Sequence, residues 1–304
     1  MDIGAQLRGL RPDRSRLVVR SYRGARMLAE RLGVQFVIKS FYSPIPELRR
    51  LTPATFDRAS PMRGIDMDLD CQSAFVAEDL SPHLAEFQPL ERGAPAGVYQ
   101  TDNPSYTRVD ADVLHAMIRH LRPRKVLELG SGHSTLVAAA ACQANARLGY
   151  PSELGSYDPC PAVAGEGIPG LTRLERVAAQ QVPIERFREL AAGDVLFVDT
   201  THTVKLGSDV NFVILDVLPE LKPGVVVHFH DIFLPWEYPR HWIESLGLYW
   251  SEQYMLQAFL AMNPCYEVLC ALGALARSRP QVLAEHVRGW RPGVTPGAFW
   301  IRRV

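Results

Sequence analysis

Short apolar runs alternate with helical patterns along the part of the chain after residue 105. Strands are predicted at 125–129, 155–157, 171–177, 195–198, 225–229, 265–270 and 298–301. Helices are predicted at 108–121, from 134 to about 147, and at 183–191, 208–221 and 252–262. This alternation is typical of a mostly parallel sheet with helices on both faces, so the predicted fold class is doubly wound α/β.

The first hundred residues follow a different pattern. A helix is predicted over 14–32, ended by Gly33, and prolines then divide the chain into short helices and loops. The proline- and glycine-bearing loop 93–105 is the candidate boundary. We therefore predict a helical N-terminal extension, residues 1–100, and a core domain, residues 101–304. The extension would act as a lid or support a homodimer.

Composition excludes several classes of protein. The 304 residues carry a formal net charge of zero, which argues against bulk binding to nucleic acid. The five cysteines are odd in number and contain no C-x-x-C pair, so neither a disulfide framework nor a zinc knuckle is expected. No apolar run is long enough to span a bilayer, and the N-terminus lacks a signal-peptide pattern. A cytoplasmic protein is expected.

The segment KVLELGSGHST, residues 125–135, carries the most specific signal. An apolar strand breaks at Gly130 and Gly132 and continues into an alanine-rich helix. The glycines allow close approach of a ligand, and the first helical turn offers free N–H groups to an anionic or polar molecule. Thr135 stands where a dinucleotide-binding fingerprint has its third glycine, and an acid, Glu128, precedes the turn.

Three predicted strands end in acids, namely Asp158, Asp199 and Asp231. The carboxyl ends of parallel strands share one edge of the sheet, and ligands bind there. A buried carboxylate without a partner is costly, so three at one edge indicate a working face. Asp158 follows the second strand, where its carboxylate could accept hydrogen bonds from a ribose diol; the alternative is a turn residue before Pro159.

Histidines accompany the last two of these acids. Asp199, His230 and Asp231 offer the oxygen and imidazole donors that suit Mg²⁺ or another divalent metal. His228 and His230 share one face of their strand while Asp231 points to the other, unless the strand ends at His230. His228 is expected to be a core histidine hydrogen-bonded to the backbone. His202, with Asp199 and His230, completes the candidate catalytic set, and His202 is the candidate general base.

The motifs together resemble class I S-adenosylmethionine-dependent methyltransferases, in particular a bacterial branch linked to sugar, polysaccharide and natural-product modification. The resemblance rests on the glycine turn with Glu128, on FVDTTH at 197–202, GSDVN at 207–211, LKPG at 221–224, HFHDIFLP at 228–235 and FYSPIP at 41–46. It implies a seven-stranded Rossmann-like sheet ending in an antiparallel strand. It also implies O-methylation of a small-molecule or glycan hydroxyl.

The resemblance implies roles for individual residues. Glu128, Gly130 and Gly132 would hold the amino-acid end of the cofactor, and Asp158 its ribose. The expected cofactor set is Glu128, Gly130, Ser131, Gly132, Ser134, Asp158 and Asp199. Related branches bind Mg²⁺ through acids at the positions of Asp199 and Asp231. The catechol-type pattern has Asp-Asn where this chain has His230-Asp231.

Two alternatives remain at this point. One is an NAD-dependent oxidoreductase, disfavoured by the missing third glycine. The other is a catalytically silent domain of this fold that acts as a binding subunit. For the acceptor, Trp236 in the loop 233–238 would form a wall of the site, and Tyr42 would belong to a lid.

Overall fold

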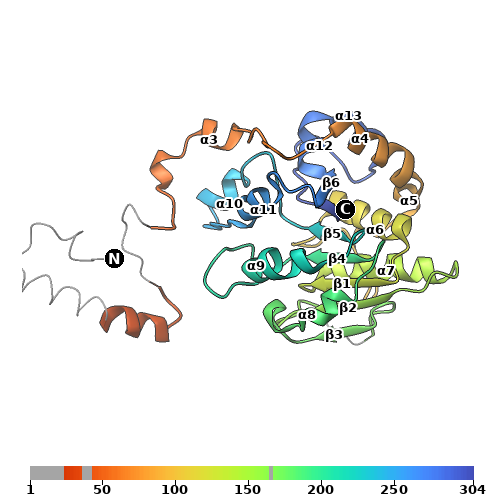
Figure 1. The fold of residues 1–304 in the computed structure, drawn as a ribbon, viewed down its shortest axis with the longest axis horizontal. Helices are drawn as coiled ribbons and strands as arrows, with labels where there is room; N and C mark the ends of the chain where they lie inside the picture. Colours follow the sequence, from red (N-terminus) through yellow and green to blue (C-terminus); the bar gives the residue numbers. More distant parts are fainter. Residues whose placement is uncertain (1–23, 36–42, 164–166) are drawn as a thin grey trace, which may run out of the picture. The chain divides into compact units, whose positions relative to one another are not determined.

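A seven-stranded sheet in the order β3-β2-β1-β4-β5-β7-β6 organises the protein. In this computed structural model, residues 24–35, 43–163 and 167–304 are described. The strands β1 to β5 are parallel (Figure 1), and β7 pairs antiparallel with both β5 and β6. The strands are β1 (Lys125–Leu129), β2 (Glu153–Tyr157), β3 (Arg173–Glu175), β4 (Val195–Val198), β5 (Val226–Phe229), β6 (Tyr266–Ala271) and β7 (Phe299–Arg303). The predicted fold class is confirmed, including the antiparallel strand at the C-terminus.

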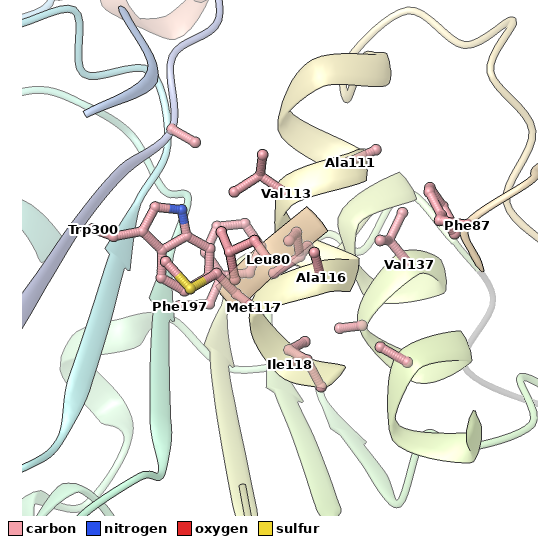
Figure 2. Close-up of a cluster of buried hydrophobic side chains, with 14 of the residues drawn as sticks. Leu80, Phe87, Ala111, Val113, Ala116, Met117, Ile118, Val137, Phe197 and Trp300 are labelled. Atoms are coloured by element: carbon pink, nitrogen blue, oxygen red, sulfur yellow. The ribbon is translucent and has the colours of Figure 1, made fainter. Parts of the chain in front are cut away.

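Neighbouring residues of the strands face two different hydrophobic layers. One layer holds Val126, Phe197 and Trp300 together with helices α6 (Arg108–Leu121) and α7 (His133–Ala146). Figure 2 shows part of this layer, where Trp300 and Phe197 lie close to Met117 of α6. Helices α12 (Leu272–Ser278) and α13 (Pro280–His286) also bury residues in it.

The second layer covers the opposite face of the sheet. Leu127, Leu196 and Val227 pack there against α8 (Ile184–Arg188) and α11 (Glu252–Leu260). The alternation follows from the two-residue period of a strand, and burial on both faces explains why the parallel strands read as continuous apolar runs.

The helix predicted over 208–221 forms as three consecutive segments. They are α9 (Asp209–Phe212), a π-helical turn η4 (Val213–Val217) and a 3₁₀ turn η5 (Leu218–Glu220). Pro219 lies in the last segment and has no N–H to donate to the preceding turn. A single regular helix therefore cannot run to residue 221, although the helical path is kept.

The boundary between units lies earlier than the sequence analysis placed it. The chain divides into residues 1–51 and 52–304, rather than at residue 100. The second unit starts with α3 (Pro53–Asp57), α4 (Leu69–Ala74), the π-helical η2 (Phe75–Leu80) and α5 (Ser81–Glu86). Val76, Leu80 and Leu84 are at most 2% exposed and belong to the same hydrophobic layer as α6. Residues 52–100 are thus part of the core domain.

The first unit is described only in part. Residues 24–31 form a helix, within the range predicted at 14–32, and η1 (Leu48–Arg50) is a short 3₁₀ turn. Tyr42, the predicted lid residue, lies outside the described residues. Over the described part of the chain, none of the helices has the length and apolar character needed to cross a membrane.

Candidate active site

The glycine turn joins the ends of β1 and β4. Gly130 has a φ of +100°, a left-handed conformation that disfavours any side chain. A Cβ there would also run into the backbone carbonyl of Asp199. The Gly130 N–H donates to the Tyr157 carbonyl of β2 at 2.9 Å. Glycine at this position therefore lets three strand ends meet within hydrogen-bond distance.

Glu128 supports the turn from beneath. Its carboxylate is fully buried and accepts hydrogen bonds from Ser134 Oγ (2.8 Å), Thr135 Oγ1 (2.7 Å) and Ser156. Thr135 also accepts the Gly132 N–H at 3.0 Å. Burial raises the pKa of Glu128 to about 7, against these hydrogen bonds, which lower it. The threonine that replaces a third glycine thus ties the turn to Glu128.

Asp158 braces the same turn from the end of β2. Its Oδ2 accepts the Ser131 N–H at 2.8 Å, and its Oδ1 accepts the Cys160 N–H at 2.6 Å. Both sequence-based interpretations therefore remain compatible with the geometry. The carboxylate shapes the turn, and each oxygen keeps a second lone pair that a ribose hydroxyl could use.

A cavity of about 270 Å³ lies in front of the glycine turn. Its lining comes from the ends of β1, β2 and β4 and from the loops that follow β3 and β4. The lining residues are Gly130, Tyr157, Asp158, Pro159, Ala178, Ala179, Gln180, Asp199, Thr200, Thr201 and Asp209. This volume lies just below the range of about 300 to 1,000 Å³ that small-molecule sites usually enclose, so the space suits a group about the size of a nucleoside rather than a larger ligand.

The cavity includes three of the predicted cofactor residues, Gly130, Asp158 and Asp199. Glu128 is enclosed below it, and contact of Glu128 with a cofactor stays a prediction. The loop residues 178–180 were not predicted, since nothing in their sequence marks them. Asp209 was also missed; it accepts hydrogen bonds from the N–H and hydroxyl of Thr201 and so fixes the loop after β4.

A cluster of carboxylates and imidazoles lies beside the cavity. The side chains of Asp199, His230 and Asp231 offer donor atoms that all lie within 4.8 Å of one another. His230 Nδ1 is 3.4 Å from Asp199 Oδ2 and 3.6 Å from Asp231 Oδ2. Strand β5 ends at Phe229, and Asp231 has a φ of +59°. Because the strand ends before His230 and the backbone turns at Asp231, the two side chains do not point to opposite faces of the sheet. The side chains of His230 and Asp231 instead converge.

His202 approaches the cluster from the other side. Its Nε2 is 3.2 Å from Asp199 Oδ1 and 3.7 Å from Asp231 Oδ2. Its Nδ1 is 2.8 Å from Oε2 of Glu252, which is fully buried. Its carbonyl accepts the N–H groups of Ser251 and Glu252, and the Trp250 ring packs on the imidazole at 4.3 Å. The start of α11 therefore fixes both the backbone and the ring of His202.

The electrostatics of the cluster favour charged forms of both histidines. Burial alone would lower the pKa of His202, but hydrogen bonds to Asp199 and Glu252 raise it to about 10. Burial also opposes the charge on His230, yet the carboxylates of Asp231 and Asp199 raise its pKa well above the ordinary value. Burial favours protonation of Asp199 too, but His230 and His202 lower its pKa strongly. The carboxylates thus attract positive charge to this point.

His228 belongs to the core, as predicted. Its ring is stacked between Phe197 at 4.3 Å and Trp300 at 4.0 Å, with interplanar angles of 8° and 7°. Neither ring nitrogen has a hydrogen-bond partner among the described residues, so the expected bond to the backbone is not formed. Burial lowers the pKa of His228 well below its ordinary value, and the ring is neutral.

Comparison with known proteins finds a family model that matches the central part of the chain. Residues 127–232 match a family model described as "Methyltransferase domain". No curated protein matches the sequence. The matched range contains the glycine turn, the end of β4 and the His230-Asp231 pair.

Several solved structures show a distant similarity. The Mg-SAM form of CmcI is 17% identical, covers 72% of this chain and 86% of its own, and gives a TM-score of 0.40. An O-methyltransferase from Bacillus cereus in complex with SAH is 13% identical, with coverages of 76% and 90% and a TM-score of 0.36. CalS11, a TDP-rhamnose 3'-O-methyltransferase, is 13% identical, with coverages of 83% and 99% and a TM-score of 0.35.

With TM-scores of 0.40 or below, these structures do not indicate which reaction this chain catalyses. The oxidoreductase and the silent binding subunit considered above are not supported by the family match. The match over residues 127–232 and the order of the strands support a methyltransferase domain of the class I fold in this chain.

Proposed function

We propose that the protein transfers the methyl group of S-adenosylmethionine to a hydroxyl oxygen of a small molecule or glycan, with the help of a divalent cation. One observation carries this proposal. Asp199 lines the cavity in front of the glycine turn, and its carboxylate is also the centre of the cluster formed with His202, His230 and Asp231. A cofactor site and a group of residues suited to activating a hydroxyl therefore share one residue.

On the donor side, the residues of this chain position the cofactor. The glycine turn and the first turn of α7 would receive its amino-acid end, and Asp158 would accept hydrogen bonds from its ribose. Methyl transfer is an in-line displacement from a sulfonium, so alignment of the acceptor oxygen with the methyl group is the main requirement. His202, His230 and Glu252 are buried and limit the access of water to this side of the site, and a dry site favours a reaction in which the sulfonium charge disappears.

On the acceptor side, Asp199, His230 and Asp231 are the residues that would hold the cation. When bound, such an ion lowers the pKa of a hydroxyl that coordinates it. The donor set fits this role because the three side chains converge and His230 Nδ1 has no hydrogen-bond partner in the described part of the chain.

His202 is the proposed proton acceptor, with Glu252 as the residue that positions it. The raised pKa of His202 means that the ring holds a proton at neutral pH while it faces the carboxylates of Asp199 and Glu252. To act as a base, His202 must first lose this proton. A cation bound beside Asp199 would supply the positive charge that the proton otherwise provides. A positioned base typically contributes roughly 10² to 10⁴-fold to the rate.

The aromatic side chains near His202 are the proposed acceptor wall. Trp250 packs on His202, and Trp242 lies edge-on to both Trp250 and Phe233. Trp236 belongs to the adjoining loop, where its carbonyl accepts a hydrogen bond from Gln253 and its ring contacts Arg277. Such a wall suits the ring of a phenol or the apolar face of a sugar.

Calorimetry and a transfer assay test the proposal in two steps. S-adenosylhomocysteine should bind the wild type and bind Asp158→Ala at least about tenfold more weakly, while NAD should not bind. Transfer from S-adenosylmethionine to a panel of phenols, catechols and sugars should then fall by roughly 10²-fold or more in Asp199→Asn. Asp216→Asn, an exposed aspartate on η4, is the matched control and should keep full activity. Methylation of nitrogen or carbon atoms alone would contradict the proposal.

A further inference from the structure

One of the three groups that would hold the cation is an imidazole, and its surroundings indicate which ions the site prefers. We propose that the site selects a first-row transition-metal ion, such as Mn²⁺, Fe²⁺, Co²⁺ or Zn²⁺, over Mg²⁺, and that Asp110 holds the His230 ring for this purpose. This inference rests on the cation of the proposed function and adds the class of ion and a supporting residue.

The orientation of His230 is the first argument. Its side chain is 6% exposed, and Nδ1 faces Asp199 Oδ2 and Asp231 Oδ2 at 3.4 and 3.6 Å. Two ligand atoms each about 2.1 Å from an ion lie roughly 3.0 to 3.4 Å apart for angles between 90° and tetrahedral. The observed separations are close to this range. The donor atoms of the three residues all lie within 4.8 Å of one another, so an inward movement of the two carboxylates would bring them to one ion with His230.

The second argument concerns what fixes the ring. Asp110 Oδ2 lies 3.7 Å from His230 Nε2, too far for a hydrogen bond but close enough for its charge to favour a proton on that nitrogen. The Asp110 carboxylate is itself held by the N–H groups of Gly297 (3.2 Å) and Ala298 (2.9 Å). The Tyr106 ring packs on the imidazole at a centroid distance of 4.7 Å. The ring is thereby held with Nδ1 directed at the two carboxylates.

The resulting arrangement is unfavourable without a positive group. Two carboxylate oxygens and Nδ1 of the buried His230 face one another, and Nδ1 finds no hydrogen-bond partner in the part of the chain that the structure describes. His202 contacts the other oxygen of Asp199, Oδ1, so it leaves Oδ2 free for an ion. A cation at this point would satisfy all three acceptors at once.

Backbone strain at Asp231 points to the same place. Its φ of +59° is uncommon for a residue other than glycine, and such strain persists only where the surroundings impose it. Gly297 packs against it: a Cβ at Gly297 would lie 2.9 Å from Asp231 Cα. The strand-to-loop turn after β5 is therefore held in the form that directs Asp231 toward His230.

The choice of ion follows from the donor set. Mg²⁺ prefers six oxygen donors and retains much of its water, whereas imidazole suits Mn²⁺, Fe²⁺, Co²⁺ and Zn²⁺. Carboxylates behind a metal-binding histidine orient the ring and raise its basicity, and their loss typically lowers metal affinity by roughly 10 to 100-fold. Asp110 lies where such a carboxylate would act.

The experiment uses the full-length protein, stripped of metal and titrated separately with Mn²⁺, Co²⁺, Zn²⁺ and Mg²⁺ by calorimetry. Pulsed electron paramagnetic resonance of the Mn²⁺ complex should show modulation from a directly bound nitrogen. His230→Glu should abolish this modulation and reduce the preference for Zn²⁺ over Mg²⁺ by at least about tenfold. Asp110→Asn should weaken Mn²⁺ binding by roughly 10 to 100-fold.

His228→Phe, two residues away on β5, is the control and should leave all metal affinities unchanged. Binding of S-adenosylhomocysteine, measured on every variant, reports folding and cofactor binding independently of the metal. Nitrogen modulation that survives in His230→Glu, an unchanged Zn²⁺ to Mg²⁺ ratio in that variant, or no binding of any ion would overturn the inference. The methyltransferase itself would still stand if S-adenosylhomocysteine binds.

Discussion

At the scale of single residues, the site depends on a few positions where the surroundings strongly restrict the residue type. Gly130 is one, because its conformation and its contact with the Asp199 carbonyl both exclude a Cβ. Glu252 is another, because it is buried without exposure and orients His202 from a helix 50 positions away in sequence. The first was marked by a motif. The second was missed, since a glutamate in the first turn of a helix is common and carries no signal of a distant partner.

Gly130→Ala should damage both stability and cofactor binding. The left-handed conformation alone costs about 1–2 kcal/mol for a residue with a Cβ, and the clash with the Asp199 carbonyl adds to it. We expect a lower melting temperature and at least about tenfold weaker binding of S-adenosylhomocysteine by calorimetry. Gly132→Ala is the matched control for stability, because its φ of −168° is ordinary and a Cβ would meet no described atom within 4 Å. An equal drop in melting temperature in the two variants would contradict the role given to Gly130.

Glu252→Gln should separate the positioning of His202 from the binding of S-adenosylmethionine. The variant removes the charge that holds His202 while keeping the shape of the side chain, so kcat for methyl transfer should fall by roughly 10²-fold or more. KM for S-adenosylmethionine should change little, because Glu252 is not among the residues that line the cavity. Glu252→Asp should recover part of the rate. A variant that loses cofactor affinity as much as kcat would instead indicate general disruption.

At the scale of elements, regular segments with clear boundaries were predictable and irregular ones were not. The ranges of α6, β1 and β4 match the prediction, because a proline or glycine borders each apolar run. The helix at 208–221 divides where Pro219 removes a hydrogen bond. The two histidines of β5 differ although they share a strand face: His228 lies inside the sheet between two aromatic rings, while His230 lies just beyond the strand end.

The sequence predicted the location of the candidate site, at one edge of the sheet, but not the arrangement of its side chains. The acids at the ends of β2, β4 and β5 gave its location. The convergence of His230 with Asp231 depends on the left-handed conformation of Asp231, two residues after the strand end. The alternation of side chains along a strand had predicted that the two residues point to opposite faces. Asp110 and Glu252 come from helices whose pairing with the sheet edge is a property of the tertiary packing.

His228→Phe tests the assignment of that histidine to the core. Its folded-state pKa is depressed by burial, so the neutral form is favoured and stability is lost as the pH falls below the ordinary value of 6.5. Phenylalanine removes this loss and two unpaired polar atoms, each of which costs about 1–3 kcal/mol when buried. Denaturant melts should show equal or higher stability at pH 7 and a shallower decline from pH 6.5 to 5. A less stable variant with unchanged pH dependence would refute the neutral, unpaired state.

At the scale of the whole molecule, the catalytic unit begins near residue 52 rather than near 101. The short helices before residue 100 looked like an appendage in sequence because prolines interrupt them. They nevertheless bury Val76, Leu80 and Leu84 in the layer that also holds α6. The role of the segment before residue 52 as a lid or dimer contact stays a prediction.

Two truncations check this division. Removal of residues 1–51 should leave a protein that folds cooperatively and binds S-adenosylhomocysteine. Removal of residues 1–100 should give an unfolded or insoluble product, because each buried leucine lost costs about 2–5 kcal/mol against a total stability of about 5–15 kcal/mol. Circular dichroism melts and calorimetry of both forms provide the comparison. A stable, cofactor-binding fragment 101–304 would restore the boundary first predicted.

The most direct test of the account is methyl transfer by metal-free and metal-reloaded protein to a panel of hydroxylated acceptors, followed by mass spectrometry. We predict formation of S-adenosylhomocysteine and an O-methylated product in equal amounts. The rate should fall by roughly 10²-fold or more on exhaustive chelation and recover when a divalent ion is returned. Transfer that proceeds at the same rate after chelation, or that yields only N- or C-methylated products, would contradict the account.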